Sequence, residues 1–121
     1  MKSFKELRVW NESMDLVCSV YSLTKLLPKE ELYSLSDQMR RAAVSIPSNI
    51  AEGNSRAGAK ERLRYLNIAM GSVSELETQL ILCARIGYLS PEQIQETVQN
   101  CEKIARMLVS FADTISSSPQ Y

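Results

Sequence analysis

A regular repeat of apolar side chains runs through the last part of the chain. Its members are separated alternately by four and three residues: Ile94, Val98, Cys101, Ala105, Leu108, Ala112 and Ile115. This spacing places one apolar seam along an α-helix and suits shallow packing against neighbouring helices. The segment Ser90-Pro91-Glu92-Gln93 supplies an N-cap, a first-turn proline and a capping box. We therefore expect a helix to begin at about Pro91.

Three further segments place apolar residues at helical spacing: 7–27, 35–52 and 59–86. Ser34 is the expected N-cap of the second helix, and Gly53 and Gly87 are expected to end the second and third. The sequence thus predicts an all-α fold, an up-down-up-down antiparallel four-helix bundle. We expect one domain over residues 1–115 and a flexible C-terminal tail over 116–121.

Pro47 lies inside the second predicted helix. It has no N–H for the Ala43 carbonyl, so a helix that contains it must bend. A helix break at Pro47 is the alternative. The apolar period continues through Ile46 and Ile50, which favours a kinked but continuous helix. We expect Ser45 or Ser48 to bond backbone groups that the kink frees.

The composition excludes several classes of chemistry. Histidine is absent from all 121 residues, which removes His-based zinc sites and Ser-His-Asp or Cys-His catalysis. The three cysteines, Cys18, Cys83 and Cys101, lie far apart among apolar neighbours. They predict reduced core residues of a cytoplasmic protein, and no secretory signal or membrane-spanning run is expected. No catalytic residue, metal or cofactor is expected.

The net charge is zero, but the charges are unevenly distributed. Six basic and only two acidic residues lie between residues 40 and 64. Such a cluster suits phosphate binding, and the candidate nucleic-acid contacts are Arg41, Arg56, Lys60 and Arg64. We expect one of Arg40 and Arg41 to pair with a carboxylate such as Glu77 or Glu52. The alternative is a solvated bundle end, whose basic residues pair with acidic residues on other helices.

Two polar features accompany the predicted helices. Ser45, Ser48, Asn49 and Glu52 surround Pro47 and could line a contact surface. Glu77 falls on an apolar stripe of the third predicted helix. A carboxylate there could be an acid with a raised pKa or a metal ligand, but pairing with an arginine or a hydroxyl is the more common arrangement.

The run from Arg40 to Gly53, RRAAVSIPSNIAEG, resembles four-helix-bundle proteins encoded within intervening sequences of 23S ribosomal RNA genes. Shorter runs also match: 7–10, 65–72, 75–80 and 87–89. Together with residues 40–53 they extend the resemblance over roughly residues 4–115. The positions that carry the family motif are Arg40, Ser45, Pro47, Asn49, Glu52, Gly53 and Glu77. The resemblance implies a small bundle that assembles as a homo-pentamer and has no established catalytic activity. A similar bundle, the accessory protein of diversity-generating retroelements, binds nucleic acid.

These observations lead to expectations about function. Residues 59–86 are apolar on nearly every side, so part of this helix is expected to meet another chain. We expect a non-enzymatic oligomer, most simply a pentamer, with residues around the second and third helices in its interface. It would bind structured RNA or a ribonucleoprotein through its basic surface. The alternative is a structural module with a protein partner and no nucleic-acid binding.

Overall fold

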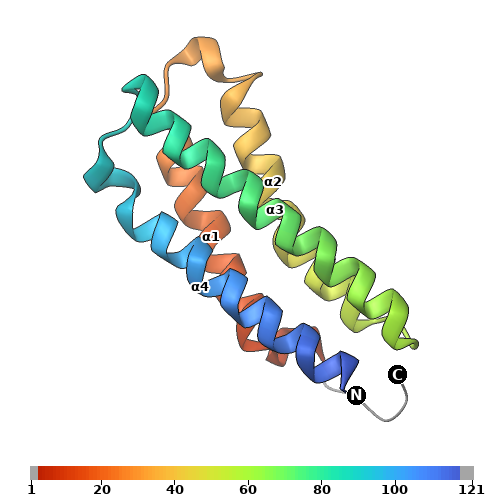
Figure 1. Cartoon of the computed structure of the whole chain (residues 1–121). Coiled ribbons are helices and arrows are strands. Elements are labelled where there is room, and N and C mark those ends of the chain that lie inside the picture. Colours follow the sequence, from red (N-terminus) through yellow and green to blue (C-terminus); the bar gives the residue numbers. More distant parts are fainter. Residues whose placement is uncertain (1–2, 118–121) are drawn as a thin grey trace.

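The computed structural model describes residues 3–117 and places most of them in four helices (Figure 1). The helices and their bounds are α1 (Arg8–Thr24), α2 (Leu35–Asn54), α3 (Ala59–Ile86) and α4 (Pro91–Ser116). Short 3-10 turns, η1 (Phe4–Glu6) and η2 (Lys29–Glu31), precede α1 and α2. No strand occurs between residues 3 and 117, so the predicted all-α class is confirmed.

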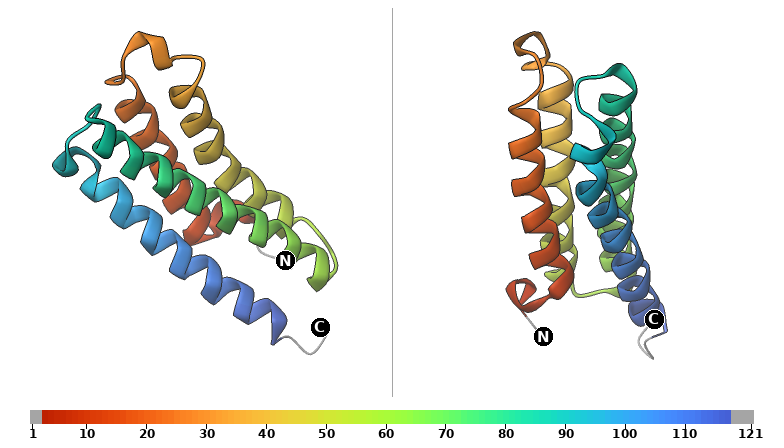
Figure 2. Two further views of the ribbon diagram at one scale, coloured as in Figure 1. Left: turned by 45° about the horizontal axis from the view of Figure 1, so that its top comes forward. Right: turned by 90° about the vertical axis from the view of Figure 1, so that its left-hand side faces the viewer.

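Each helix packs against two others. α1 and α3 both contact α2 and α4, and α1 with α2 faces α3 with α4 as two layers (Figure 2). The α1–α2 and α3–α4 connections lie at one end of the molecule, and the α2–α3 connection lies at the other (Figure 1). Fully buried side chains from every helix fill the centre, among them Leu16, Met39, Leu76 and Leu108.

Several predicted helix limits are confirmed. α3 has the expected bounds, and Gly87 follows it with a φ of +97°, a left-handed conformation that glycine adopts without a Cβ clash. The Ser90 hydroxyl accepts from the Gln93 amide at 3.1 Å, and the Ser90 amide donates to Gln93 Oε1 at 2.8 Å. α4 ends at Ser116 and Ser117 is its C-cap, so these two residues of the predicted tail belong to the end of the helix. The rest of that tail, 118–121, lies outside the described residues.

Ser34 is the N-cap residue of α2, as predicted, but its side chain makes no capping hydrogen bond. Its hydroxyl donates to Glu31 Oε1 at 2.6 Å, and the same oxygen accepts from the Leu35 amide at 3.3 Å. Tyr88, next to the end of α3, donates its hydroxyl to Glu31 Oε2 at 2.7 Å. The Ser34, Tyr88 and Leu35 hydrogen bonds together lower the pKa of Glu31. Glu31 therefore caps α2 and links the two loops at this end.

Gly53 does not end α2, contrary to expectation, because the helix continues to Asn54. Gly53 is buried where α2 meets α3. A Cβ atom built on it would lie 3.0 Å from Tyr65 Cβ and 3.2 Å from the Arg62 carbonyl oxygen. The presence of glycine at position 53 is thus explained by the close approach of α2 and α3, and not by a role in ending the helix.

Replacing Gly53 with alanine should therefore destabilise the bundle. The added methyl has to push α3 away from α2, and overpacking of this kind costs about 1–3 kcal/mol. Urea unfolding followed by circular dichroism measures the change.

Gly71→Ala is the matched control. Gly71 lies inside α3, and no heavy atom would come within 4 Å of its Cβ. Alanine there should raise the free energy of unfolding by about 0.5–1 kcal/mol, since glycine is the poorer helix former. Equal effects of the two substitutions would show that the contact at Gly53 is not tight.

The three cysteines do not share one environment. Cys83 and Cys101 are buried, but Cys18 is exposed on α1, so its predicted core position is wrong. Val17 and Cys18 fall between the buried positions Leu16 and Val20. Burial raises the pKa of the Cys101 thiol to about 12 and also raises that of Cys83.

Iodoacetamide should consequently modify one thiol per native chain at about pH 8, because the thiolate is the nucleophile and needs access. Mass spectrometry should locate the label on Cys18. In denaturant all three thiols should react. Rapid native labelling of Cys101 would contradict the packing described here.

Candidate functional site

Basic side chains gather where α2 turns into α3. We call Arg56, Lys60, Arg62 and Arg64 the basic cluster. Arg56 follows the C-terminal end of α2, and the other three lie in the first two turns of α3. The structure therefore brings together three of the four predicted nucleic-acid contacts: Arg56, Lys60 and Arg64.

Tyr65 organises two arginines of this cluster. The Arg56 and Arg64 guanidinium carbons lie 5.0 and 4.6 Å from the centre of its ring, and Arg56 also donates to the Tyr65 hydroxyl at 3.1 Å. These distances are those of cation–π contacts. The sequence patterns did not predict these contacts of Tyr65. In the sequence, Tyr65 is one residue from Arg64 and nine residues from Arg56.

Both stacked arginines also have a carboxylate partner. Arg56 pairs with Glu52 at 2.7 Å, and Arg64 pairs with Glu61 at 2.9 Å. The Arg64 hydrogen bond lowers the pKa of Glu61, and Glu61 in turn raises the pKa of Arg64. Arg56 and Arg64 thus pair with acidic residues, although the alternative interpretation expected partners on other helices. Their partners lie one turn away on the same helix or its end, not on other helices.

Two cations of the cluster have no carboxylate partner among the described residues. Lys60 is exposed and takes part in no ion pair there. Arg62 is partly buried, and its Nε atom is buried without a hydrogen-bond partner. Lys60 and Arg62 are therefore the residues of the cluster with unused positive charge.

Arg40 and Arg41 are arranged differently from the prediction. Arg41 pairs with Asp37 at 2.8 Å, and Arg40 Nε donates to Thr24 Oγ1 at 2.9 Å. One of the two arginines therefore pairs with a carboxylate, as expected, but the partner is Asp37 and neither Glu77 nor Glu52. Arg41 lies about 22 Å along the helix axis from Arg56, at 1.5 Å per residue. It does not belong to the basic cluster.

The polar run around Pro47 is largely used inside the bundle. The Asn49 amide donates to the Ser45 carbonyl at 2.8 Å and to the Ser45 hydroxyl at 3.0 Å. The Ser72 hydroxyl donates to Ser45 Oγ at 2.8 Å, which joins α2 to α3. Ser45 and Asn49 therefore stabilise the α2–α3 contact, while Ser48 is exposed.

Glu77 lacks the partner that its position predicted. Within residues 3–117 its carboxylate makes no ion pair and none of the side-chain hydrogen bonds. It lies half-buried beside Ser74, Thr78 and Ile81, which line a hollow of about 230 Å³. The described residues hold no group of three potential metal ligands, so Glu77 is not part of a metal-binding cluster there.

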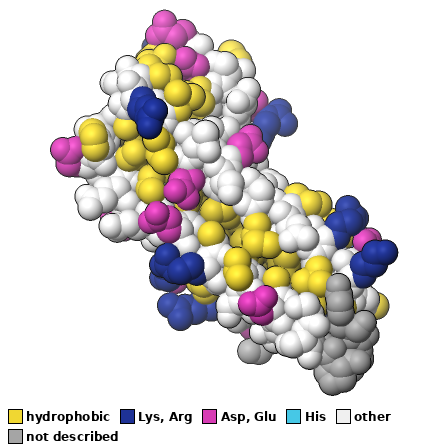
Figure 3. Space-filling view, in the orientation of Figure 1, with side chains coloured by type: hydrophobic (Ala, Val, Ile, Leu, Met, Phe, Trp, Pro, Cys, Tyr) yellow, Lys and Arg dark blue, Asp and Glu magenta, His cyan; other side chains and the backbone are white. Residues whose placement is uncertain are grey.

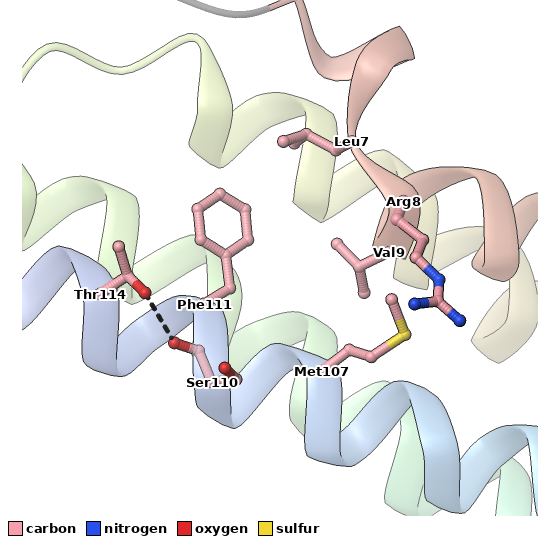
Figure 4. A pocket seen from close by; sticks show the side chains of 7 residues that line it. All are labelled: Leu7, Arg8, Val9, Met107, Ser110, Phe111 and Thr114. Carbon is pink, nitrogen blue, oxygen red and sulfur yellow. Dashed lines mark hydrogen bonds between the residues drawn. The ribbon is translucent and has the colours of Figure 1, made fainter.

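Two apolar grooves run between neighbouring helices. The groove between α1 and α2 has a volume of about 320 Å³, and its lining includes Trp10, Met14, Val44 and Pro47. A second groove of about 290 Å³ lies between the start of α1 and the end of α4, with Phe111 facing Leu7 (Figure 4). The apolar spacing in the sequence predicted neither groove.

Comparison with known proteins identifies the family. Residues 5–110 match the family described as 23S rRNA-intervening sequence protein. The chain belongs to this family. Among solved structures, it is similar to a protein of unknown function from the S23 ribosomal protein family of Bacteroides thetaiotaomicron, with 27% identity and a TM-score of 0.80. The match covers 86% of this chain and 97% of that one. No curated protein matches the chain.

Membership of the family agrees with the resemblance seen in the sequence. The positions of the family motif fall on α2 and α3, the two helices joined by Gly53 and by the Ser45–Ser72 hydrogen bond. In the described part of the chain, no helix is both long and apolar enough to cross a membrane.

Proposed function

We propose that the protein is a non-enzymatic bundle that assembles with copies of itself and acts by binding. The observation that supports this most directly is the apolar outer surface of α3. Four large side chains remain 39–51% exposed on this helix: Ile68, Ile81, Leu82 and Ile86. Large apolar side chains exposed along one helix are candidates for an interaction surface.

The packing of α3 explains why this surface is unusual. α2 and α4 already cover the buried face of α3, which carries Leu66, Val73, Leu76 and Leu80. A solvent-facing helix side normally carries charged and polar residues. The family resemblance suggests five subunits, and the exposed residues on α3 agree with an interface that includes this helix.

Light scattering at micromolar concentration tests self-assembly. We expect a mass close to five times the 13.6 kDa of one chain. The pair Ile81→Gln and Leu82→Gln should lower this mass, because it removes apolar surface from α3.

Leu26→Gln provides the control, since Leu26 is 57% exposed but lies in the α1–α2 connection. It should leave the mass unchanged. A 13.6 kDa monomer for the unmodified chain would overturn the proposal.

Binding of structured RNA is the second candidate function. Lys60 and Arg62 favour it, because they lack carboxylate partners in the described part of the chain. Assembly would repeat this modest site and supply avidity. Arg56 and Arg64 would contribute by exchanging Glu52 and Glu61 for phosphates, since exposed ion pairs are worth only about 0–1 kcal/mol.

Lys60→Glu should weaken retention on a structured RNA at low salt by reversing one exposed charge. Retention by the unmodified chain should fall between about 50 and 200 mM salt, as expected for counterion release. Filter binding measures both effects.

Lys29→Glu, at the opposite end of the bundle, is the control that should leave RNA binding unchanged. Absence of salt-dependent binding by the unmodified chain would remove this candidate and leave self-assembly alone.

The proposal includes three further features. The bundle has an up-down-up-down topology, which the placement of its connections at alternate ends supports (Figure 1). Helix α2 bends at Pro47, because this residue lies inside the helix and has no N–H for the Ala43 carbonyl. The protein acts in the cytoplasm, which its unpaired cysteines support.

A further inference from the structure

Opposite faces of the bundle carry complementary charges beside apolar side chains. We propose that the chain assembles head to tail, with the α1–α2 face of one copy on the α3–α4 face of the next, and with Arg40 paired to Glu77 across the contact. This inference rests on the self-assembly proposed above and identifies its two surfaces. Because α1 and α3 each pack against both α2 and α4, the α1–α2 and α3–α4 faces lie on opposite sides.

The α1–α2 face offers a concave apolar surface. Its groove of about 320 Å³ is lined by Trp10, Met14 and Val17 from α1 and by Val44 and Pro47 from α2. Met14 and Val44 are 42% and 41% exposed. This surface therefore contains apolar area that a second chain could cover.

On α2, Arg40 lies one helical turn N-terminal to Val44 and on the same face. Its Nε donates to Thr24 Oγ1, and its guanidinium lies 5.0 Å from the centre of the Tyr21 ring. These contacts hold the guanidinium in place and leave both Nη atoms available for an acceptor. No carboxylate in residues 3–117 lies within ion-pair distance of Arg40.

The α3–α4 face carries the complementary carboxylate. Glu77 lies in the hollow of about 230 Å³ with Ser74, Thr78 and Ile81. Exposed apolar residues accompany it, since Ile81 is 39% and Val109 51% exposed. Figure 3 views the molecule from this side and shows hydrophobic side chains among acidic and basic ones.

The chemistry of the two groups fits a direct pair. Two Nη atoms of a guanidinium match the two oxygens of a carboxylate in a bidentate ion pair. The serine and threonine hydroxyls beside Glu77 provide further acceptors for the same donors. Arg41 already has Asp37 as an ion-pair partner, whereas neither Arg40 nor Glu77 has an ion-pair partner within residues 3–117.

The two faces differ, so their contact is heterologous: every copy uses one face toward each neighbour. A symmetric contact of the α1–α2 face with itself would instead leave Glu77 outside the contact. Head-to-tail contacts generate a ring when the rotation closes. The proposal thus makes predictions that a symmetric face-to-face dimer does not.

Charge reversal tests the pairing. Arg40→Glu and Glu77→Arg should each reduce the assembly to 13.6 kDa chains by placing like charges across the contact. The double variant, with both changes in one chain, should recover the mass of the unmodified assembly. Light scattering and native mass spectrometry give the masses, and circular dichroism verifies that each variant remains helical.

Mixing the two single variants distinguishes head-to-tail from symmetric contacts. The Arg40→Glu chain keeps an intact α3–α4 face, and the Glu77→Arg chain keeps an intact α1–α2 face. Together they should co-assemble beyond a dimer, because every contact between unlike variants joins a guanidinium to a carboxylate, in the native order at one contact and in the reversed order at the next. A symmetric contact would stop at a dimer. Arg41→Glu, beside Arg40 but already paired with Asp37, should keep the full assembly.

The outcomes separate this inference from the proposed function. Full assembly of both single variants, or failure of the mixed pair to associate, would overturn the face pairing while self-assembly stands. A monomeric unmodified chain would overturn both. If Arg40→Glu alone loses helix content, Glu77→Arg carries the test, because Glu77 makes no ion pair within the described chain that the substitution could break.

Discussion

The close approach of α2 and α3 at Gly53 determines the arrangement of the basic end. A Cβ atom at this position would lie 3.0 Å from Tyr65 Cβ, so glycine lets the two helices come together here without a displacement of α3. Tyr65 is thereby brought within reach of Arg56, which follows α2. Farther along the same helices, the Ser45–Ser72 hydrogen bond joins them a second time. Residues of the motif shared with the family, such as Ser45 and Gly53, therefore form a helix–helix contact inside the bundle.

The sequence predicts features that depend on local backbone chemistry. The bounds of α3, the left-handed Gly87 and the capping box at Ser90 all follow from residues close together in the chain. It fails where a residue has two physical uses. Gly53 could end a helix or permit a close contact, and only the position of α3 distinguishes them. Likewise Ser34 could cap α2, but the Glu31 carboxylate accepts from the same helix end.

The candidate site is only partly predictable for the same reason. Clustering of Arg56, Lys60 and Arg64 follows from their closeness in sequence and from the turn between two helices. Their pairing depends on which carboxylates lie one turn away and on a tyrosine that both guanidinium groups reach. The two contacts of Arg40 show most clearly what the sequence does not predict. Thr24 and Tyr21 lie on another helix, and only the packing of α1 against α2 brings them to Arg40.

The proposed self-assembly and nucleic-acid binding would be coupled by the geometry of this molecule. The basic cluster lies at the α2–α3 end, whereas Arg40 and Glu77 lie on the sides of the bundle. Contacts through the sides leave the α2–α3 end of each copy uncovered. In a closed ring every copy is equivalent by rotation, so all of these ends are presented toward the same side. One exposed lysine and one partly buried arginine would make a weak phosphate site, but a ring would repeat that site at fixed spacing and convert it into a multivalent surface. The salt dependence of RNA binding should therefore decrease in variants that dissociate the assembly, even though their basic clusters are intact.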